Sequence, residues 1–87
     1  MHLKYAFDTM ELDELTIAVP VGENVSQFRG VIKLNETAAY ILKLLKNEIS
    51  EEEIVKALEK EYDVPHELII EDVKRYISEF EKRGLLA

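Results

Sequence analysis

The chain of 87 residues contains no cysteine and no tryptophan, and it has only three glycines and two prolines. Without cysteine, a disulfide scaffold, a thiolate metal site and a thiol nucleophile are all excluded. The same absence fits a reducing compartment, so we expect a cytoplasmic location. Few glycines and prolines indicate few, short loops. No apolar run approaches the roughly 18 residues that a membrane span requires. The N-terminus does not resemble a signal peptide, so we expect no membrane partner.

The charge of the chain is strongly one-sided. Eighteen acidic and eleven basic residues give a formal net charge of −7. A net-acidic domain repels phosphate backbones unless it carries a local basic patch, so we expect no nucleic-acid partner. Hydrophobic residues make up 47% of the chain, which is ordinary for a folded domain and excludes disorder. The length fits a single domain over residues 1–87.

The first third of the chain has the pattern of strands. β-Branched and aromatic residues lie between turn residues, which predicts strands over 4–12, 15–21 and 28–34. Alternation places Leu15, Ile17 and Val19 on one face of the second strand. Short turns between the strands indicate an antiparallel meander, and its first and third strands are then sheet edges.

After Asn35 the pattern changes to that of helices. Apolar spacing predicts helices over about 36–46, 51–62 and 66–83. Asn35 is a favourable N-cap, Ser50 and Glu53 form a capping-box pattern, and Gly84 stops the last helix. The predicted fold class is therefore α+β, a three-stranded antiparallel meander followed by three helices, in a winged-helix-like order.

An ordered set of residues along these segments resembles the PqqD-like family, whose members are also called RiPP recognition elements. The set covers nearly the whole chain, and its most specific part is the strand-to-helix junction Leu34-Asn35-Glu36-Thr37-Ala38. The other landmarks are Ile17-Ala18-Val19-Pro20-Val21-Gly22, Gly30-Val31-Ile32-Lys33, Ile41, Leu44, Leu45, Glu53-Ile54-Val55, Leu58, Glu61-Tyr62-Asp63-Val64, Asp72-Val73, Ile77 and Arg83-Gly84-Leu85-Leu86. The chain departs from the common pattern at 47–49, where many relatives have a glycine-containing turn.

The resemblance implies a non-catalytic peptide-binding module without a cofactor. Such domains bind the leader segment of a ribosomally made precursor peptide and present it to a modifying enzyme, often a radical S-adenosylmethionine protein. The family binds the peptide in a cleft between the third strand and the third helix. The predicted strand edge supports the same site independently, because an extended peptide can pair with its free N–H and C=O groups.

The candidate peptide-binding residues come from these two elements. They are Phe28, Arg29, Gly30, Val31, Ile32, Lys33, Ile69, Val73, Tyr76, Phe80 and Arg83. The alternative for the apolar members is simple burial in the core, and Val73 is one of the stronger core candidates. The basic members are candidates for pairing with acidic leader residues. Their alternative is a solvated surface, and Glu79 offers Arg83 a partner one turn earlier, as Glu71 does Arg75.

Catalytic and metal-binding patterns are missing from the sequence. His2 and His66 are the only histidines, and neither has a partner at metal-ligand or triad spacing. We expect His2 at a frayed terminus and His66 on the surface. Two other functions remain open, a winged-helix DNA-binding domain and a general protein–protein adaptor. The mixed charges of the third helix disfavour DNA binding. The oligomeric state is expected to be a monomer or a dimer paired through the edge of the third strand.

Overall fold

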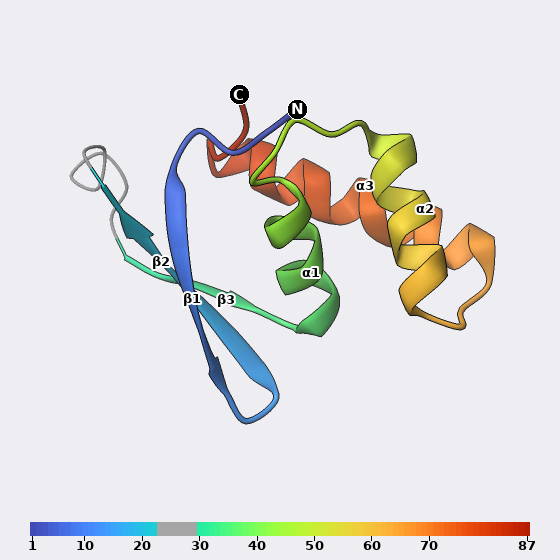
Figure 1. The fold of residues 1–87 in the computed structure, drawn as a ribbon, viewed down its shortest axis with the longest axis horizontal. Helices are drawn as coiled ribbons and strands as arrows, with labels where there is room; N and C mark the ends of the chain where they lie inside the picture. The colour runs from blue at the N-terminus through green and yellow to red at the C-terminus, as the bar shows by residue number, and fades with distance from the viewer. Residues whose placement is uncertain (23–29) are drawn as a thin grey trace.

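The computed structural model describes residues 1–22 and 30–87 of the chain (Figure 1). An antiparallel sheet of three strands, in the order β1-β2-β3, precedes three helices. The elements are β1 (Ala6–Leu12), β2 (Leu15–Val21), β3 (Ile32–Leu34), α1 (Glu36–Leu44), α2 (Glu51–Glu61) and α3 (His66–Lys82). The predicted α+β class and the order of strands and helices are confirmed.

The strands β1 and β2 form a hairpin whose tip extends away from the helices (Figure 1). Leu12 pairs with Leu15, so Asp13 and Glu14 alone make the turn, and Asp13 has a φ of 54°. Aspartate tolerates this left-handed conformation better than most residues. β2 then pairs with β3 through Ile17 and Lys33 and their neighbours, which leaves β1 and β3 at the two ends of the sheet order.

Leu15, Ile17 and Val19 share one face of β2, as alternation predicts, and the burial pattern shows which face the helices cover. Ala18 and Pro20 are the buried residues of this strand, whereas Leu15 is exposed and Ile17 and Val19 are half-buried. Alternation along the strand therefore places Leu15, Ile17 and Val19 on the face opposite the helices. Both faces of the strand are apolar, so periodicity alone could not say which one the helices cover.

The predicted helix ends are present as specific hydrogen bonds. The Asn35 side chain accepts a hydrogen bond from the Ala38 amide, and Ser50 and Glu53 form a reciprocal capping box. Gly84, with a φ of 73°, ends α3. The Leu85 amide donates to the Phe80 carbonyl at 3.0 Å, and the Gly84 amide donates to Glu81 at 2.9 Å. These two bonds are the Schellman pattern, which glycine favours because it has no Cβ.

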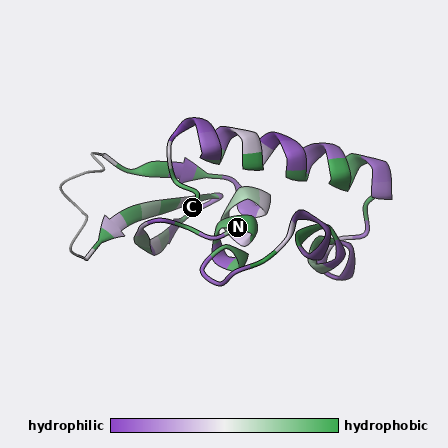
Figure 2. Cartoon of the chain, turned by 90° about the horizontal axis from the view of Figure 1, so that it is seen from above, coloured by the Kyte–Doolittle hydropathy of each residue, from purple (hydrophilic) through white to green (hydrophobic). Residues whose placement is uncertain are grey.

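One core joins the sheet to the helices. α1 packs against β2 and β3, and α2 packs against α3. Figure 2 shows alternating hydrophilic and hydrophobic bands along α3, as expected for a helix with one buried face. The buried residues of this hydrophobic core are Phe7, Ala18, Ile32, Leu34, Ala38, Ile41, Leu42, Leu45, Ile54, Val55, Leu58, Ile69, Val73, Ile77, Phe80 and Leu85. Among the described residues, no helix is long and apolar enough to cross a membrane.

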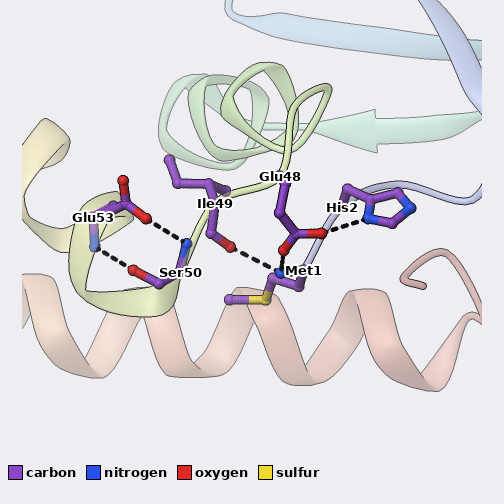
Figure 3. A network of polar contacts seen from close by, with 6 residues as sticks. All are labelled: Met1, His2, Glu48, Ile49, Ser50 and Glu53. Atoms are coloured by element: carbon purple, nitrogen blue, oxygen red, sulfur yellow. Dashed lines mark hydrogen bonds and ion pairs between the residues drawn. The ribbon is translucent and has the colours of Figure 1, made fainter.

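The N-terminal residues are held in place, so the expectation that His2 lies at a frayed end is wrong. Leu3 forms a β-bridge with Leu86, and its amide donates to the Leu45 carbonyl at 2.9 Å. Figure 3 shows Glu48 between the Met1 ammonium and the His2 ring, with His2 Nδ1 at 2.8 Å from the carboxylate. This segment thereby ties the α1–α2 connection to the C-terminal residues.

Candidate functional site

A small groove of about 130 Å³ lies between β3 and the last turns of α3. Its walls come from three elements that are distant in the sequence, β3, the start of α1 and α3. The lining residues are Ile32, Lys33, Leu34, Asn35, Ala38, Tyr76, Glu79, Phe80 and Arg83. The groove therefore joins the end strand of the sheet to one face of a helix.

The groove has an apolar floor and a polar rim. Ile32 and Leu34 alternate with Lys33 along β3, so both point toward the helices and are buried. Phe80 of α3 is buried against the same core. Tyr76, one turn before Phe80, is half-buried. An extended chain lying here would meet backbone groups on one side and an aromatic wall on the other.

A side-chain hydrogen bond joins the two walls. Asn35 Nδ2 donates to the Tyr76 hydroxyl at 2.7 Å, while Asn35 Oδ1 caps α1 through the Ala38 amide at 2.8 Å. The asparagine thus uses both ends of its amide, one for the helix and one for the groove. The sequence indicated the capping role alone, because nothing local shows that Tyr76, 41 residues later, lies beside Asn35.

The ion pairs near the rim of the groove differ from those expected between residues one helical turn apart. Arg75 pairs with Asp72 at 3.2 Å rather than with Glu71, and its guanidinium carbon lies 4.9 Å from the centre of the Tyr76 ring. Arg83 and Glu79 both line the groove. Within the described part of the chain, Arg83 forms no ion pair, so the adjacent Glu79 does not neutralise it by direct contact.

The structure places the described members of the predicted site in different surroundings. Ile32, Lys33, Tyr76, Phe80 and Arg83 line the groove. Ile69 and Val73 are buried in the core and do not line it.

The remaining predictions concern the segment before β3. Gly30 and Val31 are exposed and do not line the groove. Phe28 and Arg29 lie outside the described residues. The prediction of a strand over 28–34 is wrong at Gly30 and Val31, because β3 begins at Ile32. The groove also contains Leu34, Asn35, Ala38 and Glu79, which the sequence did not single out. Of these, Leu34 was predictable, because alternation along β3 places it on the same face as Ile32.

A larger hollow, of about 840 Å³, lies beside β1. Its lining carries five carboxylates, from Glu11, Asp13, Glu14, Glu36 and Glu61, against the two lysines Lys43 and Lys46. Tyr40 and Tyr62 meet there edge to face, with centroids 6.1 Å apart. Burial, followed by the nearby carboxylates of Glu36 and Glu61, raises the pKa of Tyr62. This acidic lining makes the hollow a poorer host than the β3 groove for a peptide with acidic residues.

Titratable side chains do not converge on a reaction centre in the described residues. Within 1–22 and 30–87, no group of three or more His, Cys, Asp or Glu side chains is placed to hold a metal ion. His66 pairs with Glu59 on the surface, and His2 with Glu48. What the described geometry offers is a place to hold a chain.

Fold and groove together define a small sheet-and-helix domain with a binding groove at one edge of its sheet. The family model for coenzyme PQQ synthesis protein D (PqqD) matches residues 20–86. The chain belongs to this PqqD family. It is also similar to the solved structure titled "TbiB1 in Complex with the TbiA(beta) Leader Peptide", with a TM-score of 0.75 and 21% identity. That match covers 99% of this chain and 94% of the other. No curated protein matches the sequence.

Proposed function

We propose that this chain binds the leader segment of a ribosomally made precursor peptide, without catalysing a reaction itself. The observation that carries the proposal is the groove between β3 and α3, in which a strand edge faces an aromatic wall. Membership of the PqqD family supports it, as does the similarity to TbiB1, whose structure was solved with a leader peptide. The bound segment is then presented to a modifying enzyme, for which we propose a radical S-adenosylmethionine protein.

The peptide binds by adding a strand to the free edge of β3. Backbone hydrogen bonds supply affinity with little demand on sequence, and side chains that enter the groove supply selectivity. Alternate residues of an added strand point toward the groove, where Ile32, Leu34 and Phe80 favour an apolar side chain. Arg83, which has no ion-pair partner among the described residues, attracts a carboxylate of the leader.

A matched pair of tyrosine variants tests the position of the groove. The probe is the leader of the precursor peptide encoded beside this chain, with its affinity measured by isothermal titration calorimetry. Tyr76→Ala removes the aromatic wall and is expected to weaken binding at least tenfold, about 1.4 kcal/mol. Tyr40→Ala removes a tyrosine from the other hollow and should change affinity less than threefold. Equal losses in the two variants would contradict the proposed groove.

Strand addition has its own test. Leader peptides methylated at single backbone amides lose one donor each without losing a side chain. Because alternate amides of an edge strand point toward its neighbour, methylation should weaken binding at every second residue of the bound segment. A uniform tolerance of methylation, with binding otherwise intact, would rule out pairing with β3.

A further inference from the structure

The face of the sheet opposite the helices is apolar and uncovered by any described element. We define the outer face as the side chains of β1, β2 and the β3 segment that alternation places there, namely Asp8, Met10, Leu12, Leu15, Ile17, Val19, Val31 and Lys33. Six of these eight are apolar. Met10 is 57% exposed, Leu12 49%, Leu15 47% and Val31 51%. Uncovered apolar patches of this kind commonly mark interaction surfaces.

The pairing register brings these side chains into contact rows. Leu12 lies opposite Leu15, and Met10 lies opposite Ile17. Ile17 in turn lies opposite Lys33. Val31 comes directly before β3, and continuing the register by one residue would place it beside Val19. The apolar residues are therefore contiguous across β1 and β2 and extend toward the start of β3.

The two charged residues of the outer face are arranged for self-recognition. Asp8 lies on β1 and Lys33 on β3, which are opposite ends of the sheet order. A two-fold axis parallel to β2 would place β1 of one copy over β3 of the other. Asp8 then lies about 7 Å along the strand from the partner's Lys33, and the sheets are about 10 Å apart, so the two backbone positions are about 12 Å apart, a separation that the two side chains together can span. The same contact occurs twice, as isologous symmetry requires.

We propose that the outer face is a dimerisation surface, on which a second copy of this chain packs sheet against sheet. Aligned antiparallel sheets pack about 10 Å apart, with interdigitating apolar side chains like those present here. The opposite charges at the two edges fit a second copy specifically, because each copy supplies both signs in the required places. Such a dimer leaves the free edge of β3 open, unlike a dimer paired through that edge.

The small area of the outer face limits the affinity of the dimer. Two strands of seven residues and one of three, at about 3.3 Å per residue and about 4.8 Å apart, cover roughly 270 Å² in plan. Stable interfaces bury about 800 Å² on each partner. The net charge of −7 on each copy also opposes association. We therefore expect a weak dimer, with a dissociation constant of about 0.1–1 mM.

Sedimentation equilibrium of the whole chain, without peptide, tests the proposal at about 20 µM to 1 mM. The wild type should show a monomer–dimer equilibrium. Met10→Glu places a charge in the apolar contact and should weaken the dimer at least tenfold, while an exposed position limits its effect on folding. Leu68→Glu is the matched control, since Leu68 of α3 is 50% exposed but lies outside the outer face. It should leave the equilibrium unchanged.

Exchanging the charges of Asp8 and Lys33 tests whether the dimer has the proposed two-fold symmetry. Asp8→Lys and Lys33→Asp should each weaken the dimer, and the double variant should restore it, because the pair is then re-formed with reversed signs. A chain that stays monomeric at about 1 mM would overturn the proposal. A dimer unaffected by Met10→Glu would also overturn it, in favour of edge pairing. Because no peptide is present, these outcomes are independent of leader binding.

Discussion

At the scale of single residues, Asn35 links the start of a helix to the proposed binding groove. Its two hydrogen bonds, to the Ala38 amide and the Tyr76 hydroxyl, fix the junction of β3 and α1 against α3. The first bond satisfies an N-terminal amide that the helix itself leaves without a partner. The second positions the tyrosine ring along the groove. One side chain therefore serves both the fold and the site.

Two substitutions separate these roles. Asn35→Ala removes both bonds and should lower the free energy of unfolding by about 1–2 kcal/mol in urea denaturation. Asn35→Asp keeps the acceptor for Ala38 but cannot donate to Tyr76. Its cost should stay below about 0.5 kcal/mol, because the bond to Tyr76 is exposed. If both variants lost the same stability, the capping role assigned to Asn35 would be incorrect.

Glu48 predicts a pH dependence of stability. The hydrogen bond from the Met1 ammonium, followed by that from His2, lowers the pKa of Glu48 below its usual value of 4.5. A carboxylate with a lowered folded-state pKa contributes stability above its unfolded pKa, and this contribution is lost as the pH falls through the folded value. Glu48→Gln should therefore cost stability at pH 6 and progressively less below pH 4.5.

Thermal unfolding between pH 3 and pH 7, on a chain with a free amino terminus, measures this difference. Glu11→Gln in β1 is the control, because Glu11 forms no ion pair within the described residues. A Glu48→Gln cost that did not vary with pH would contradict the ion pairs with Met1 and His2.

At the scale of elements, the end of α3 positions the groove residues Phe80 and Arg83. Gly84 allows the chain to reverse there, with Leu85 returning to the core beside Phe80. A Cβ on Gly84 would meet nothing within 4 Å, so space does not explain the glycine. The φ of 73° at Gly84 explains the glycine, since residues with a Cβ are disfavoured in that conformation.

Gly84→Ala should consequently lower the free energy of unfolding by about 1–2 kcal/mol. The cost reflects backbone conformation alone. Lys82→Ala, at an exposed position of the same helix, should change stability by less than about 0.5 kcal/mol. Urea denaturation of both variants gives the comparison, and a neutral Gly84→Ala would exclude the left-handed ending of α3.

Prediction from sequence succeeded where the signal is local. The helix caps at Asn35 and Ser50, the stop at Gly84 and the bounds of β2 depend on residues a few positions apart, and all are present. The burial of Ala18 and Pro20 was not predictable, because both faces of β2 are apolar and the choice depends on where α1 packs. Local patterns carry no information on such distant contacts.

The candidate site shows the same limit. The end strand and the wall helix were predictable, and so were Ile32, Tyr76 and Phe80 as members of those elements. Ile69 was assigned to the groove because α3 has a wide apolar face, but its burial places it in the core. The contribution of Asn35 depends on a contact across 41 residues, which only the folded chain reveals.

At the scale of the whole molecule, the sheet offers two surfaces with different chemistry. The edge of β3, with its groove, suits an extended peptide, while the outer face suits another apolar surface. The two surfaces meet at β3, where Ile32 and Leu34 face the groove and Lys33 the outer face. Lys33 contributes to both, since it also lines the groove.

The most direct test of leader binding is a titration of the isotope-labelled chain with its leader peptide, followed by amide NMR. The account predicts saturating shifts concentrated in Ile32–Asn35 and in the last two turns of α3, around Tyr76 and Arg83. Amides lining the hollow beside β1, such as that of Tyr40, should move little. Saturating shifts confined to that hollow or to α2, with the groove unmoved, would contradict the proposed site.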